Sequence, residues 1–186
     1  MSGTDPRGSW PGALEHAPVA TLGRIDRLRV LAAALPGVDV QERVIDAPFD
    51  RVWGWVSDLE RSVPQFDADV AKLRVLERRG PAGDERLRIR AAGPAKLLWL
   101  PWTFDVDLRP GWCWMVSTPQ SYLVGMAAEP VGEQTRFAHL EGIAFKGPRA
   151  VQAALGPLYA VSRWRHTRHL PHDLANIARL LADEPA

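Results

Sequence analysis

The sequence contains a long series of strand-like segments separated by glycine and proline. Between positions 70 and 145, apolar and polar residues alternate in six segments, and a turn with Gly or Pro follows each of the first five. The segments are 70–79, 85–93, 100–109, 111–118, 121–130 and 135–145. Because side chains alternate between the two faces of a strand, this pattern predicts a sheet with one face turned toward a core.

The segments on either side of this series complete the expected order of elements. Residues 38–45 alternate like a further strand, and residues 47–66 change to two short helices, with Pro48 in the first helical turn. Residues 149–181 are mostly helical, with interruptions expected at Pro157 and Pro171. The order strand, two helices, six strands and long helix predicts an α+β domain over residues 38–182.

The N-terminal part differs in composition from this domain. Residues 1–20 are rich in Gly, Pro, Ser and Ala and are expected to be a flexible tail. Residues 21–37 are expected to be a helical extension, with an apolar stripe that includes Ile25 and Leu28 and with Pro36 ending it. The stripe could pack on the domain or on a partner, such as a second copy in a homodimer. A position on a membrane surface is a less favoured alternative.

The length, composition, net charge and cysteine count of the chain argue against several classes of protein. A length of 186 residues with 46% hydrophobic residues suits one domain, and a net charge of +1 argues against an obligate nucleic-acid binder. The single cysteine, Cys113, rules out an internal disulfide and a CxxC site. The longest apolar run, "LLWLPW" at 97–102, is far shorter than a transmembrane segment, and no secretory signal is visible. We therefore expect a cytoplasmic protein with a small-molecule or protein partner.

Two segments resemble a known family. The first segment is 47–66, "APFDRVWGWVSDLERSVPQF", in which an Ala-Pro step precedes a helix that contains Val-Trp, then a Ser-Asp pair and a turn with a proline and an aromatic residue. The second segment is 126–147, "MAAEPVGEQTRFAHLEGIAFKG", in which one strand ends near Glu-Pro, a turn with glycine follows, and the next strand starts with Thr-Arg-Phe. Both resemble the START-related SRPBCC superfamily, in particular its polyketide cyclase/dehydrase branch. The resemblance implies a helix-grip fold, in which a curved antiparallel sheet wraps around a long C-terminal helix and encloses a cavity.

The resemblance also implies a function. The ligand would be a hydrophobic aromatic, polyketide-like or lipid molecule, and no metal or nucleotide cofactor is expected. One alternative is an enzyme that cyclises or dehydrates its ligand by general acid–base catalysis. The other is a non-catalytic carrier or sensor, for example in lipid transport or quinone binding.

Alternation indicates which side chains line the cavity. In segment 100–109, Trp102 and Phe104 should face inward, whereas Asp105 and Asp107 should face solvent, where they could pair with arginines of segment 85–93. In segment 111–118 either the two tryptophans or the residues next to them face inward; indoles are costly to expose, which favours the tryptophans. The expected ligand-binding residues are Trp102, Phe104, Trp112, Trp114, Tyr122 and Phe137.

His139 and Glu141 are the candidate catalytic residues. They share the face of segment 135–145 that carries Phe137, and residues two apart on a strand lie roughly 7 Å from each other. A histidine exchanges protons near neutral pH, and burial is expected to raise the pKa of the glutamate, which would suit acid–base chemistry. The alternative roles are ligand contact and structural hydrogen bonding.

Three further histidines lie in the expected C-terminal helix. His166, His169 and His172 are spaced by three residues, so they drift around the helix, and neither a Cys nor a carboxylate cluster is evident beside them. With arginines on either side, they are interpreted as a solvated or anion-facing stripe rather than a metal site.

Overall fold

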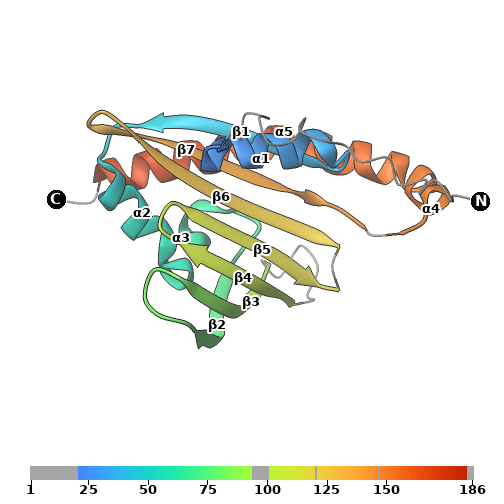
Figure 1. The fold of residues 1–186 in the computed structure, drawn as a ribbon, viewed down its shortest axis with the longest axis horizontal. Coiled ribbons are helices and arrows are strands. Elements are labelled where there is room, and N and C mark those ends of the chain that lie inside the picture. The colour runs from blue at the N-terminus through green and yellow to red at the C-terminus, as the bar shows by residue number, and fades with distance from the viewer. Residues whose placement is uncertain (1–20, 94–100, 120, 146, 184–186) are drawn as a thin grey trace, which may run out of the picture.

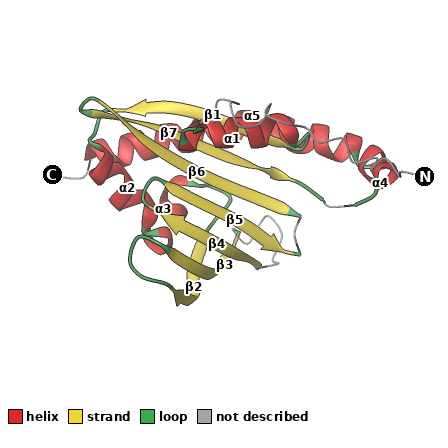
Figure 2. Cartoon of the chain, in the orientation of Figure 1, coloured by secondary structure: helices red, strands yellow, loops and turns green. Residues whose placement is uncertain are grey.

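The computed structural model describes residues 21–93, 101–119, 121–145 and 147–183, so the expected tail at 1–20 and most of the apolar run at 97–102 lie outside the described residues. The elements follow the expected order (Figures 1 and 2). They are α1 (Arg24–Ala34), β1 (Val38–Ile45), α2 (Phe49–Ser57), α3 (Leu59–Phe66), β2 (Lys72–Arg79), β3 (Glu85–Ala92), β4 (Trp102–Arg109), β5 (Trp112–Thr118), β6 (Tyr122–Val131), β7 (Gln134–Ile143), α4 (Arg149–Ala154) and α5 (Gly156–Asp183).

The strands form one seven-stranded antiparallel sheet in the order β1-β7-β6-β5-β4-β3-β2. Strands β2 to β7 follow one another as a meander, because each pairs antiparallel with the next strand along the chain. The first strand joins the far side of the meander, where Val40 lies opposite Leu140 of β7. The sheet curves, and the long helix α5 runs beside β1 and β7 (Figure 1). This arrangement confirms the predicted α+β helix-grip fold.

The two faces of the sheet carry separate hydrophobic clusters. On the inner face, side chains such as Ile89 and Phe137 pack with residues of α2, α3 and α5. On the outer face, Ile25 and Leu28 of α1 pack with apolar residues of β1, β6 and β7, among them Leu140. The apolar stripe of the N-terminal extension thus packs on its own domain, and strand β7 is buried on both faces.

Polar contacts fix the position of α1. The backbone N–H of Ile25 donates a hydrogen bond of 3.2 Å to the Glu129 carboxylate at the end of β6, which satisfies one of the free N–H groups of the first turn. At the other side of the helix, the guanidinium of Arg29 forms a two-pronged contact with Glu42 of β1, at 2.6 and 2.7 Å.

The expected interruption near Pro157 is present, because α4 ends at Ala154 and α5 begins at Gly156. The expected interruption at Pro171 is absent, because α5 is continuous over its 28 residues. Pro157 lies in the first turn, where a missing N–H costs nothing, and Pro171 is held within the helix by the burial of Leu170 and Leu174 on either side. The hydroxyl of Ser162 donates to the carbonyl of Gly37 at 2.8 Å and joins the helix to the start of β1. None of the helices in the described residues combines the length and hydropathy that a membrane span requires.

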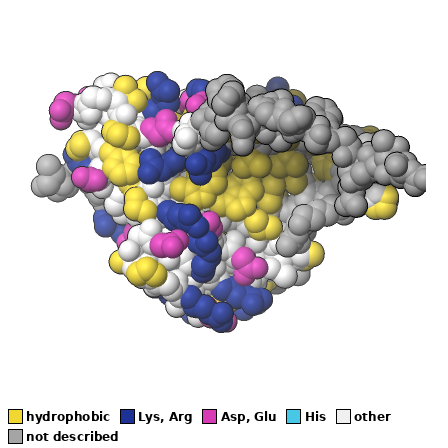
Figure 3. All heavy atoms as spheres, viewed as in Figure 1, with side chains coloured by type: hydrophobic (Ala, Val, Ile, Leu, Met, Phe, Trp, Pro, Cys, Tyr) yellow, Lys and Arg dark blue, Asp and Glu magenta, His cyan; other side chains and the backbone are white. Residues whose placement is uncertain are grey.

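The outer surface of β3 and β4 carries interleaved charges of both signs (Figure 3). Arg86 of β3 pairs with Asp107 of β4, and Arg109 lies 3.0 Å from the same carboxylate. Arg88 and Arg90 are exposed, as alternation predicts. Acidic groups thus offset part of the positive charge of this surface.

Candidate functional site

A cavity of about 270 Å³ lies between the inner face of the sheet and the α3–β2 region. Most of its wall is apolar, and one end is polar. The apolar part includes Val63, Phe66, Leu73, Ile89, Phe104, Met115, Val124 and Met126, and the polar part includes Asp67, Asp69, Tyr122, His139, Glu141 and Arg165. An apolar pocket with a few convergent polar groups is the usual form of a small-molecule site.

Most of the predicted site residues meet at this cavity. Trp102 and Phe104 of β4 line it together with Tyr122 of β6, and their rings are within 6.5 Å of the Tyr122 ring, measured between centroids. His139 and Glu141 of β7 lie at its polar end. Phe137 faces the same side of the sheet but is fully buried in the core, outside the cavity lining.

The predicted orientation of Trp112 and Trp114 is reversed in the structure. Both indoles lie on the outer face, where they pack against the α1 cluster, and Cys113 and Met115 face inward. The prediction assumed that an outward indole would be exposed to solvent. That assumption failed because α1 covers the outer face and shelters both rings.

His139 and Glu141 form a direct pair. Their side chains lean toward each other along β7, so that His139 Nε2 lies 3.4 Å from Glu141 Oε1, and both are almost completely buried. Burial by itself would raise the pKa of Glu141, but the hydrogen bond and the charge of His139 outweigh burial and lower the pKa to about 2. This direction corrects the expected rise.

The pKa of His139 changes in the complementary direction. Burial by itself would lower the pKa of His139, but the contact with Glu141 and the charges of Asp173 and Asp67 outweigh burial and raise it. Both shifts favour the charged form of the pair, an imidazolium beside a carboxylate. Such a pair orients a polar ligand group by charge and hydrogen bonding.

Tyr122 extends this pair into a buried network. Its hydroxyl donates to Glu141 Oε2 at 3.2 Å and also lies 2.7 Å from His166 Nε2. His166 Nδ1 lies 2.7 Å from the carbonyl oxygen of Ser162, to which it donates. Burial lowers the pKa of His166, and burial with the charge of Glu141 raises the pKa of Tyr122 well above its usual value. One hydroxyl hydrogen thus faces two acceptors, a carboxylate and a neutral imidazole.

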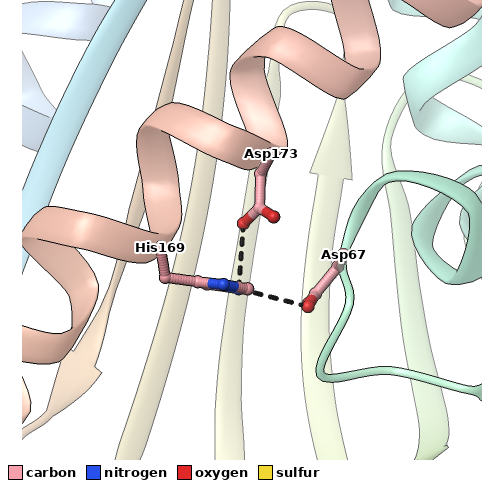
Figure 4. A group of neighbouring side chains, drawn as sticks. All are labelled: Asp67, His169 and Asp173. Carbon is pink, nitrogen blue, oxygen red and sulfur yellow. Dashed lines mark ion pairs between the residues drawn. The ribbon is translucent and has the colours of Figure 1, made fainter.

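A second polar cluster lies beside the first, between α5 and the loop that follows α3 (Figure 4). His169 Nε2 lies 3.3 Å from Asp67 Oδ1 and 3.1 Å from Asp173 Oδ2. The same Asp173 oxygen lies 3.6 Å from His139 Nδ1, which connects the two clusters. Contact with Asp67 raises the pKa of His169 to about 9, and burial raises the pKa of Asp173 to about 8.

These contacts correct the interpretation of the three helical histidines as a solvated stripe. His166 is 2% exposed and His169 lies in the second cluster, whereas His172 is exposed as expected. Asp173, four residues after His169, could have been noticed from helical spacing. Asp67 could not, because it approaches α5 only through the tertiary fold.

The fold and the cavity together define a helix-grip domain, and known structures share this fold. The chain has 21% identity to the protein TTHA0849 from Thermus thermophilus, with a TM-score of 0.58 over 79% of this chain and 99% of that one. The Zhui aromatase/cyclase from a Streptomyces species has 18% identity and a TM-score of 0.56, over 78% and 93% of the two chains. A START superfamily protein from Mycobacterium smegmatis has 15% identity and a TM-score of 0.58, over 77% and 98%.

These likenesses show that the chain has the SRPBCC polyketide cyclase-like fold, as the sequence resemblance implied. No protein-family model and no curated protein sequence matches the chain. The comparisons therefore concern the fold, and the function must be argued from the cavity.

Proposed function

We propose that the protein binds a hydrophobic small molecule, aromatic, polyketide-like or lipid in nature, inside the cavity. The observation that carries this proposal is an apolar wall that ends at a buried polar network. Burial of a ligand against this wall would be favourable by roughly 25 cal/mol per Å² of apolar surface removed from water. The cavity is small, so we expect a compact ligand or one end of a longer one.

The polar end should select ligands that carry an oxygen-bearing group. Tyr122, His139 and Glu141 all line the cavity and are held in place by one another. An apolar group placed against them would leave polar atoms unpaired, which is costly in a buried site. A carbonyl or hydroxyl group on the ligand would instead be oriented by them.

A second candidate function is acid–base catalysis on this ligand, such as the cyclisation or dehydration of a poly-keto chain. It is favoured by the Tyr122 hydroxyl, which lies between Glu141 and a neutral His166 and is placed to pass a proton between them. One of the proteins with a similar fold is named an aromatase/cyclase. The carrier or sensor role differs only in the absence of turnover.

Binding is tested by titration with a hydrophobic aromatic probe, 1-N-phenylnaphthylamine, followed by its fluorescence. Trp102→Ala should weaken binding by about 10-fold, since each lost indole contact removes a large apolar area from the cavity wall. Trp164→Ala is the matched control, because Trp164 is exposed on α5 and lies outside the cavity lining. Equal affinities for the unmodified protein and both variants would place the ligand elsewhere. Native mass spectrometry of protein from its own host would identify a retained ligand.

Catalysis is tested with a short poly-β-keto thioester. If the protein turns it over, Tyr122→Phe and Glu141→Gln should each lower kcat by about 100-fold or more, the usual effect of losing a proton-transfer group. Tyr159→Phe is the control, because the Tyr159 hydroxyl bonds to Gln152 away from the cavity. Binding without turnover would assign the carrier or sensor role.

A further inference from the structure

The second polar cluster is composed like a metal site. One ligand atom each from Asp67, His169 and Asp173 lies within 4.8 Å of the other two (Figure 4). We propose that these three residues bind a divalent transition-metal ion of the Zn²⁺ type at the polar end of the cavity. This proposal goes beyond ligand binding and does not depend on it.

The distances in the cluster suit such an ion. Zn²⁺ binds imidazole nitrogen and carboxylate oxygen at about 2.0–2.2 Å, so tetrahedral ligand atoms are separated by about 3.3–3.6 Å. His169 Nε2 lies 3.3 Å from Asp67 Oδ1 and 3.1 Å from Asp173 Oδ2. A small adjustment of side chains would bring all three atoms into one coordination sphere.

Two buried ligand atoms of the cluster lack a hydrogen bond. Within the described part of the chain, neither Asp173 Oδ2 nor His169 Nε2 forms one. Asp173 is 1% exposed, and its Oδ2 faces both histidines. A buried carboxylate oxygen without a hydrogen bond is costly, and a cation satisfies its charge and its coordination together.

The charges in the cluster also balance. Two carboxylates and a neutral imidazole offset the double charge of the ion in formal terms. Of the other basic groups at this end of the cavity, His139 is paired with Glu141 and Arg165 is directed to Asp69. Three protein ligands leave at least one coordination position for water or a ligand oxygen, which is the arrangement of metal sites that act on a ligand. Because Asp67 is part of the cavity lining, that position would have access to the cavity.

The rival interpretation is a metal-free ion-pair network, in which a protonated His169 bridges the two carboxylates. Both interpretations predict that the cluster contributes to stability. They differ in whether the purified protein takes up a metal ion, so uptake is the property to measure.

The experiment is calorimetric titration of tag-free, chelator-treated full-length protein with ZnCl₂, repeated with CoCl₂ while the visible absorption spectrum is recorded. We expect one ion per chain and an intense Co²⁺ absorption of a four-coordinate site. Asp67→Asn and His169→Gln should each weaken binding by at least about 100-fold, which exceeds the 10–100-fold typical for residues outside the coordination sphere. His172→Gln is the matched control, since His172 is exposed on the same helix.

Circular dichroism establishes which variants fold. If His169→Gln, in helix α5, does not fold, Asp67→Asn still tests the site, because Asp67 lies in a loop. Loss of uptake in the folded ligand variants, with uptake retained in His172→Gln, supports the site. Absence of Zn²⁺ uptake by the unmodified protein at 100 µM overturns the proposal. Uptake that survives Asp67→Asn and His169→Gln, or that is lost in His172→Gln, overturns it as well, because the ion then binds elsewhere.

Discussion

The indole rings of Trp112 and Trp114 stack on the outer face of the sheet, with centroids 6.2 Å apart and planes inclined by 16°. The space beside them is filled by α1: a Cβ atom added at Gly125 would lie 2.8 Å from Leu28 Cδ2 and 3.1 Å from Trp114 Cζ3. A side chain at position 125 would therefore have to displace Leu28 or the Trp114 ring. The N-terminal helix is an integral part of the packed domain and not an appendage.

Loss of the packing between α1 and the sheet should therefore lower the stability of the protein. Leu28 is fully buried, so Leu28→Ala should lower the free energy of unfolding by about 2–5 kcal/mol, measured by urea denaturation. Leu22→Ala, at an exposed position just before the helix, should change it by no more than about 0.5 kcal/mol. Similar effects of the two substitutions would show that α1 does not pack on the sheet.

The buried pair of β7 and the surface pair of β3 and β4 should respond differently to loss of a charge. Glu141→Gln removes the nearest negative charge beside the buried His139 and should cost about 3–5 kcal/mol of unfolding free energy. Asp107→Asn removes a partner of the exposed Arg86 and Arg109 and should cost no more than about 1 kcal/mol. Chemical denaturation at neutral pH measures both. A Glu141→Gln cost as small as that of Asp107→Asn would contradict the charged state assigned to the pair.

Cys113 should resist alkylation in the folded protein. Burial raises the pKa of its thiol, so it stays protonated, and only the thiolate is nucleophilic. Between pH 7 and 9 an exposed cysteine reacts faster as pH rises, whereas modification of Cys113 by iodoacetamide should remain slow. Mass spectrometry should show rapid labelling once urea is added. Fast, pH-dependent labelling without urea would mean that Cys113 is accessible in the native state.

Ser162 should contribute measurably to the attachment of α5. Its hydroxyl donates to the Gly37 carbonyl at 2.8 Å and accepts from the backbone N–H of Ile143 at 3.3 Å. Ser162→Ala should lower the unfolding free energy by about 1 kcal/mol, the usual net value of a buried hydrogen bond. Ser57→Ala, at an exposed helix end, is the control and should have little effect. If Ser162→Ala is as stable as the unmodified protein, the hydrogen bonds of Ser162 do not help to hold α5 in place.

Local sequence was sufficient for the order of the elements and for much of the cavity wall. Side chains of a strand alternate between faces whatever the rest of the chain does, so the pattern of residues 100–109 already placed Trp102 and Phe104 on one side and Asp105 on the other. The same rule put His139 and Glu141 on a common face. Glycine and proline marked the turns because they favour or forbid particular backbone angles.

Only the tertiary structure decided which of two alternating faces is the inner one, and which charges meet. Trp112 and Cys113 exchange their expected sides because a helix from the N-terminal extension covers the outer face, and alternation carries no information about that cover. The loop residue Asp67 reaches His169 of α5 only through folding. The pKa of Glu141 falls rather than rises for the same reason: it depends on the distances to His139 and His166, and these distances are properties of the packed molecule.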